Sequence, residues 1–175
     1  MILLNLEILN NVIPATSNDD TRYYLKGVYI EDRDGFRHYT ACDGHILFTQ
    51  SEEIEGDALP RSIILGVTKP IKDKANLAEL VLVDDTTAVL KTSPKTACDL
   101  VDTEYPDYRR IIPSDREVAK QYAQFEPEYM KKLFKFIPEA KGLAPFMEHR
   151  QSAALWEQGN KQAVIMPIRY TNFEE

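Results

Sequence analysis

The chain has 175 residues, an ordinary hydrophobic content of 43% and a net charge of −7, which together indicate one or two globular domains. No apolar run approaches the roughly 20 residues of a membrane span, and the first residues lack the pattern of a secretory signal. The acidic total argues against tight DNA binding through a broad basic face, but it does not exclude a small basic face on an acidic body.

The chain contains two cysteines, Cys42 and Cys98. They are too few and too far apart in sequence for a disulfide framework, which indicates a reduced, cytoplasmic setting. No spacing of His, Cys, Asp or Glu is typical of a metal site, and we expect no cofactor.

The first elements follow from local pattern. Apolar residues recur at helical spacing over residues 6–13, with Asn5 as a suitable N-cap and Pro14 as a helix breaker. Asp34-Gly35 is a turn signal between strands. Strands are expected over residues 23–31, 39–42 and 45–49, followed by a connection over residues 51–59.

The same order of elements then recurs. A short strand over residues 61–65 precedes a predicted helix over residues 68–76, with Thr68 as its cap and Pro70 in its first turn. Strands are expected over residues 79–83, 87–92 and 96–101. Residues 1–113 therefore contain two copies of a unit made of a strand, a helix and several strands, without sequence identity between the copies.

A third copy is expected after a polar link over residues 114–117. Residues 127–137 form the clearest amphipathic helix, with lysines off its apolar face. Strands are expected over residues 118–125, 143–147, 152–156 and 162–170. The sequence therefore predicts an α+β fold with one domain over residues 1–113 and half a domain over residues 114–175.

Four stretches in order carry a resemblance: residues 21–27 (TRYYLKG), 41–47 (ACDGHIL), 105–113 (YPDYRRIIP) and 164–169 (VIMPIR). They resemble the bacterial DNA polymerase III beta sliding clamp family, whose members form rings around duplex DNA. Residues 1–113 resemble the family's second domain, and residues 118–170 resemble the last half of its third domain. The resemblance implies a DNA-clamp fold in a shortened form.

In that family, a groove between the second domain and the C-terminal strand binds short, partly apolar peptides of polymerases and other replication proteins. The resemblance implies that the same groove uses Leu25, Cys42, Gly44, His45, Leu47, Pro106, Arg110, Ile111, Tyr129, Val164, Met166, Pro167, Ile168 and Arg169. Aliphatic side chains would supply apolar burial, and a few polar groups would orient the peptide. Residues 164–168 also fit an edge strand that completes a sheet.

The resemblance also implies contact with double-stranded DNA through Arg22, Tyr23, Tyr24, Lys69, Lys72, Lys74, Lys131, Lys132 and Lys135. Lysines on a channel wall attract phosphate without sequence preference, and tyrosines stack on exposed bases. There are simpler interpretations: the lysines of residues 131–135 as the solvated face of an amphipathic helix, and Tyr23 and Tyr24 as ordinary strand residues.

The first functional hypothesis is a clamp-like accessory protein of DNA replication without catalytic activity, which binds partner peptides. Tethering of these partners to DNA is a further part of this hypothesis. The alternative is a soluble competitor that occupies clamp partners without encircling DNA. A small hydrolase using Asp43 and His45 is the least favoured, because no nucleophile motif accompanies them. We also expect a homo-oligomer through the half-domain, because an isolated half-domain exposes a sheet edge and an apolar flank.

Overall fold

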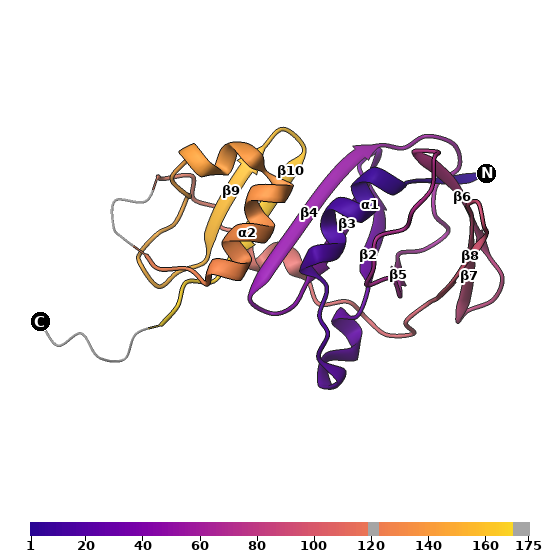
Figure 1. Ribbon diagram of the computed structural model, residues 1–175, viewed down its shortest axis with the longest axis horizontal. Helices are drawn as coiled ribbons and strands as arrows, with labels where there is room; N and C mark the ends of the chain where they lie inside the picture. Colours follow the sequence, from indigo (N-terminus) through magenta and orange to yellow (C-terminus); the bar gives the residue numbers. More distant parts are fainter. Residues whose placement is uncertain (119–122, 170–175) are drawn as a thin grey trace, which may run out of the picture. The chain divides into compact units, whose positions relative to one another are not determined.

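The computed structural model describes residues 1–118 and 123–169. The chain divides into two compact units, Met1–Pro106 and Asp107–Glu175, which we call unit 1 and unit 2. The sequence places the corresponding boundary slightly later, after residue 113. Figure 1 shows the helices and strands of both units, coloured along the sequence.

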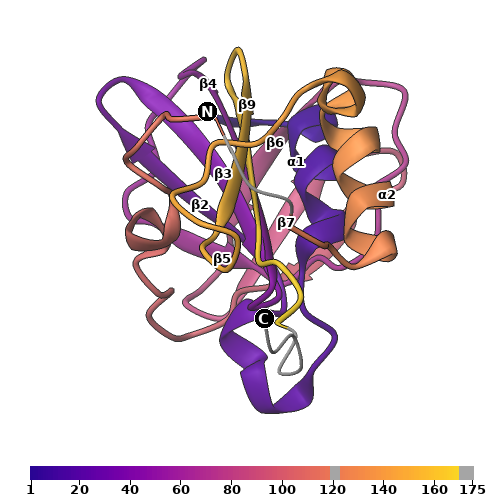
Figure 2. The ribbon, with the colours of Figure 1, turned by 90° about the vertical axis from the view of Figure 1, so that its left-hand side faces the viewer.

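Unit 1 begins with strand β1 (Ile2–Asn5) and helix α1 (Leu6–Val12), which continues as the 3-10 turn η1 (Ile13–Ala15). The predicted cap is confirmed, since the Asn5 side chain accepts hydrogen bonds from the backbone N–H groups of Glu7 and Ile8 at 3.0 and 3.2 Å. These bonds satisfy donors that have no partner inside the helix. The apolar side of α1 is buried and packs against β3 and β4, on one side of their sheet (Figure 2).

The first sheet of unit 1 is antiparallel, with strands in the order β5-β2-β3-β4. Its members are β2 (Val28–Arg33), β3 (Phe36–Cys42), β4 (Ile46–Glu53) and β5 (Ile63–Leu65). The predicted hairpin turn is confirmed, because Asp34 and Gly35 both have positive φ, at 54° and 83°, as a two-residue type I′ turn requires. Strand β4 runs to Glu53, so the expected connection over residues 51–59 starts later than predicted.

The second sheet of unit 1 has the order β1-β6-β7-β8, with β6 (Leu77–Leu82), β7 (Thr87–Lys91) and β8 (Thr96–Asp99). The two halves of unit 1 therefore exchange their first strands: β1 pairs with β6, and β5 pairs with β2. Inward side chains alternate with outward ones along these strands, so that Leu4, Leu80 and Leu90 are buried in the core.

The predicted helix over residues 68–76 is wrong, because this segment is irregular. Among the apolar side chains of residues 68–76, Ile71 alone is half-buried and the others are exposed. A helix there would therefore have no apolar face to bury. The Asn10 side chain holds the segment instead. Its Oδ1 accepts from the N–H of Ile71 at 2.8 Å, and its Nδ2 donates to the carbonyl of Ile71 at 2.9 Å.

The predicted strand over residues 23–31 is wrong in its first half. Asp20–Leu25 forms a 3-10 element, η2, which projects beyond one end of the β2-β3-β4 sheet (Figures 1 and 2). Asp19 caps it by accepting from the N–H of Thr21 at 2.9 Å. This local side-chain bond competes with strand pairing, and so the strand begins only at Val28.

Unit 2 contains the 3-10 turn η3 (Tyr108–Ile111), helix α2 (Pro127–Phe136), the turn η4 (Pro138–Gly142) and a hairpin of β9 (Ala154–Gln158) and β10 (Lys161–Ile165). Trp156 lies in its core, 5.4 Å from Phe125 between ring centroids. The expected strand over residues 143–147 reduces to a bridge at Phe146, which also pairs with Val118. Residues 119–122 of the expected strand over 118–125 lie outside the described residues.

Candidate functional site

The β3–β4 turn and the strand residues on either side of it carry four residues of the predicted groove: Cys42, Gly44, His45 and Leu47. Asp43 holds this turn, because its Oδ1 accepts from the backbone N–H groups of His45 and Ile46, both at 2.9 Å. Gly44 has φ +96°, a backbone conformation that favours glycine. The rim of the predicted groove is therefore an ordered turn with its glycine and histidine exposed.

Cys42 is buried beneath this turn. Burial raises the pKa of its thiol to about 11, and the sulfur accepts from the N–H of Gly44 at 3.2 Å. A thiol with this pKa stays protonated near neutral pH, so Cys42 behaves as an apolar side chain. Asp43 uses its carboxylate to form the turn, and the hydrolase hypothesis gains no support from this geometry.

The apolar groove residues of unit 1 differ in accessibility. Leu25 and Leu47 are 5% and 1% exposed, so both side chains are buried in the core of unit 1. Pro106 is exposed and follows Tyr105, whose ring stacks on Tyr29 with 4.7 Å between centroids and 7° between planes. This stack fixes the chain where unit 1 ends.

Unit 2 carries the remaining groove residues. Arg110 and Ile111 lie in η3, where Ile111 is 44% exposed and Arg110 Nε lies 3.3 Å from Asp107 Oδ2. Val164 is buried in β10. The expected strand over residues 162–170 is too long, since β10 ends at Ile165.

The segment after β10 carries the other apolar groove residues. Met166 and Ile168 are half-buried, Pro167 is buried and Arg169 is exposed. The N–H of Ile168 donates to the carbonyl of Gln124 at 2.8 Å, which ties this segment to the one before α2. Tyr129 lies half-buried on α2, and Tyr170 lies outside the described residues.

The proposed DNA-facing residues of unit 1 fall into two groups. Arg22, Tyr23 and Tyr24 lie in η2, where Tyr23 is 56% exposed and its ring meets that of Tyr24 edge-on at 5.9 Å. Lys69, Lys72 and Lys74 are exposed, but they lie on the irregular segment after β5 and not on a helix. Their predicted arrangement on a helix face is therefore wrong.

The lysines of α2 lie where the sequence predicts them, off the buried side of the helix. Lys131 Nζ pairs with Glu128 Oε1 at 2.6 Å, and Lys132 Nζ lies 5.5 Å from the centre of the Tyr129 ring. Lys135 is exposed near the helix C-terminus, where a cation is favoured by the helix dipole. Two of these three cations are thus already partly compensated within the helix.

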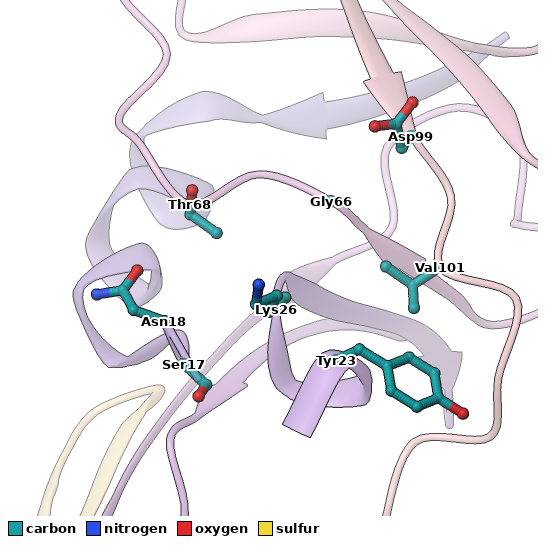
Figure 3. Close-up of a pocket in the computed structure, with 8 residues that line it drawn as sticks. All are labelled: Ser17, Asn18, Tyr23, Lys26, Gly66, Thr68, Asp99 and Val101. Carbon is teal, nitrogen blue, oxygen red and sulfur yellow. The ribbon is translucent and has the colours of Figure 1, made fainter. Parts of the chain in front are cut away.

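A surface cavity of about 380 Å³ adjoins η2. Its lining comes from the segment before η2, from η2 and its end, and from the chain after β5 and at the end of β8 (Figure 3). Of the predicted site residues, the lining includes Tyr23 and no groove residue. The sequence gives no signal for this cavity, because segments far apart in the chain form it.

The described residues contain no group of three His, Cys, Asp or Glu side chains that could hold a metal ion. In the part of the chain that the structure describes, no helix is long and apolar enough to cross a membrane.

A family model described as the central domain of the DNA polymerase III beta subunit matches residues 4–107. The chain belongs to this family. The match covers almost all of unit 1, including η2 and the β3–β4 turn. The beta subunit family consists of processivity factors of DNA replication that have no catalytic activity of their own.

Relatives and solved structures agree with this assignment. The beta sliding clamp of Haemophilus influenzae is 28% identical over 140 residues, which is 72% of this chain and 36% of that protein. The sliding clamp of Bacillus subtilis has a similar structure, with a TM-score of 0.74 at 17% identity over 97% of this chain and 64% of that chain. A Pseudomonas aeruginosa sliding clamp has a TM-score of 0.75 at 16% identity, over 97% of this chain and 66% of that chain.

The structural matches confirm the clamp fold and the α+β class predicted from sequence. This beta subunit family member spans about a third of the length of the curated relatives that it matches.

Proposed function

We propose that this chain binds short clamp-interaction peptides of polymerases and other replication proteins, and so acts as a clamp-like adaptor in the cytoplasm. The observation that carries the proposal is the family match over residues 4–107, which spans Leu25 and the whole β3–β4 turn. In this proposal unit 1 is a clamp domain and unit 2 is half of another, and each unit carries residues that the family resemblance assigns to peptide binding.

Met166 and Ile168 support the proposal. Both are apolar, half-buried and placed after the end of β10, so part of each side chain is available to a ligand. Met is unbranched and adapts to side chains of different shape. Burial of one such side chain by a peptide contributes roughly 1.5–3 kcal/mol, which corresponds to roughly a ten- to hundredfold change in affinity.

The test is a binding titration with a fluorescent peptide that carries a clamp-binding motif, with a scrambled peptide as reference. We expect Met166→Ala to weaken binding roughly tenfold or more. Met130→Ala is the matched control, because Met130 is also a half-buried methionine of unit 2 and is not a groove residue. Equal affinity for the scrambled peptide, or equal loss in both variants, would contradict the proposed site.

Contact with duplex DNA is the second part of this proposal. Tyr23 and the α2 lysines supply an exposed ring and three cations. Binding of this kind weakens as salt concentration rises, because counterions are released from the DNA. We expect weak DNA binding at low salt that falls when Lys131, Lys132 and Lys135 are replaced by alanine. Lys91→Ala, which removes a cation paired with Glu79 on β6, is the control.

A soluble competitor is the alternative function that one observation favours. The net charge is −7, and two of the α2 lysines are partly compensated by Glu128 and Tyr129. If the chain binds the peptide but is never retained on primed circular DNA, the competitor is the better description. Retention on the circle, with release after linearisation, would favour the adaptor.

Self-association through unit 2 is the remaining part of the proposal. Leu143 and Val118 are both 52% exposed in this unit, which is a large exposure for apolar side chains. We expect the molar mass measured by light scattering to rise with protein concentration. A constant monomer mass up to high concentration would contradict self-association.

A further inference from the structure

Arg22 contacts the β3–β4 turn, although it lies in η2, some twenty residues earlier in the chain. Its Nη1 donates to the carbonyl of Asp43 at 3.1 Å. The same nitrogen sits against Gly44 so closely that a Cβ added to Gly44 would overlap it. The side chain is 41% exposed, so part of it remains in contact with solvent.

The backbone of η2 places Arg22 for this contact. Two 3-10 turns meet at a kink at Arg22, where φ is −109° and ψ is 49°. Asp19 lies on the same side, with its Oδ2 3.8 Å from Arg22 Nε. Oδ1 of Asp19 accepts hydrogen bonds from both the backbone N–H and the hydroxyl of Thr21, and these two bonds fix the orientation of the carboxylate. The guanidinium is thus held between the Asp19 carboxylate and the Asp43 carbonyl.

From this geometry we infer that Arg22 is a positioning residue of the β3–β4 turn, and that it couples DNA contact at η2 to the shape of the turn. The coupling rests on the proposed function, because it takes η2 as a DNA contact and the turn as part of the peptide site. The positioning role of Arg22 does not depend on either ligand.

Whether DNA strengthens or weakens the turn depends on which nitrogens of the Arg22 guanidinium already have a partner. Nη1 is occupied by Asp43, whereas the N–H groups of Nη2 form no hydrogen bond within the described residues. A phosphate oxygen can therefore accept from Nη2 while Nη1 stays on the carbonyl of Asp43. A phosphate there restricts the side-chain rotamers of Arg22, which steadies its bond to Asp43 and hence the turn.

This coupling is reciprocal by thermodynamic necessity. If DNA steadies the turn that carries Gly44 and His45, a peptide that binds the steadied turn must also favour the DNA-bound arrangement of Arg22. DNA contact and peptide binding would then strengthen each other through one side chain.

The test measures amide hydrogen exchange in the whole 175-residue chain by NMR. Without any ligand, we expect Arg22→Ala to speed exchange at His45 and Ile46 by roughly three- to tenfold, as for the loss of one hydrogen bond that supports the turn. Ala41 and Phe48, which pair within the β3–β4 ladder, should be unchanged. Unchanged exchange at His45 and Ile46 would overturn the positioning role.

Lys26→Ala is the matched control, because it removes one cation from the same loop. Lys26 Nζ pairs with Asp20 and makes no hydrogen bond to the turn. We expect the control to leave exchange at His45 and Ile46 at the wild-type rate. If the control speeds exchange as much as Arg22→Ala does, the effect belongs to the charge of the loop and the inference fails.

The coupling is tested by adding a short DNA duplex whose binding is followed separately by fluorescence anisotropy. We expect bound DNA to slow exchange at His45 and Ile46 in the wild type and not in Arg22→Ala. Faster or unchanged exchange with DNA bound overturns the coupling. If no DNA binds, the proposed DNA contact and the coupling both fail, and the ligand-free comparison still decides the positioning role.

Discussion

Arg37 and Asp32 form a bidentate ion pair in the core of unit 1. Nε of Arg37 lies 2.8 Å from Oδ1 of Asp32, and Nη2 lies 2.7 Å from Oδ2, with side chains that are 1% and 9% exposed. The same guanidinium donates to the carbonyls of Leu3 and Asp57. One side chain therefore holds β1 and the chain after β4 against the first sheet.

We expect Arg37→Ala to lower the free energy of unfolding by about 3–5 kcal/mol, because it leaves the Asp32 carboxylate buried without its cation. Urea denaturation measures the change. Arg61→Ala is the control, because the Arg61–Asp85 pair is well exposed, at 50% and 90%. Its loss should change stability by no more than about 0.5 kcal/mol. Similar losses in the two variants would contradict the role of the buried pair.

Gly27 and Gly142 make a matched pair for a steric prediction. A Cβ at Gly27 would overlap the carbonyl oxygen of Leu65, which is backbone and cannot rotate away. We expect Gly27→Ala to cost about 1–3 kcal/mol of unfolding free energy, as in other overpacked sites. At Gly142 nothing lies within 4 Å of an added Cβ. Thermal unfolding should therefore show Gly142→Ala as near neutral, and an equal loss there would refute the steric argument.

Asn10 should control the irregular segment over residues 68–76. Because its amide makes both a donor and an acceptor bond to the backbone of Ile71, we expect Asn10→Ala to cost about 1–3 kcal/mol and to speed amide exchange at Ile71. Lys72→Ala changes an exposed residue of the same segment and should have no effect on either measurement. Unaltered exchange at Ile71 in Asn10→Ala would show that the segment is held by something else.

His38 gives the protein a pH-dependent stability. Burial lowers the pKa of His38 below its ordinary value of 6.5, with help from Arg33, while Glu31 and Asp34 oppose the shift. His38 therefore binds a proton more readily in the unfolded chain than in the folded one. Its contribution to the free energy of unfolding is fully present above pH 6.5 and is lost as the pH falls below that value.

An NMR titration of His38 measures the folded-state pKa directly. Urea denaturation at pH 7.5 and 5.5 should show a loss of stability at the lower pH that is smaller in His38→Gln. His149→Gln, which changes an exposed histidine of unit 2, is the control. A pKa of His38 at or above 6.5 in the titration would contradict the prediction.

Features encoded by neighbouring residues could be predicted from the sequence. Asn5 next to an apolar helical pattern predicts the start of α1, and Asp34-Gly35 predicts a turn with two positive φ angles. Both depend on side-chain chemistry within a few residues. The four ordered motifs likewise predicted the family, which the match over residues 4–107 confirmed. The assignments of individual groove and DNA residues stay predictions.

Other features were beyond such reasoning because distant residues decide them. Thr68 is a plausible N-cap for a helix over residues 68–76. The side-chain amide of Asn10 instead bonds to the backbone N–H and carbonyl of Ile71, and the segment has no apolar face that a helix could bury. Tyr23 and Tyr24 have strand-forming side chains, yet the Asp19 cap sets a 3-10 turn there. Local propensity is a weak prior, and long-range bonds override it.

The sequence by itself thus determined the family, the fold class, the first helix and its cap, and the hairpin turn, because each is fixed by local pattern or by a motif. Only the tertiary structure decided that β1 pairs with β6 and β5 with β2, that Arg37 is buried against Asp32, and that Arg22 reaches Asp43. Buried backbone and charged groups must find partners, and those partners lie far along the chain.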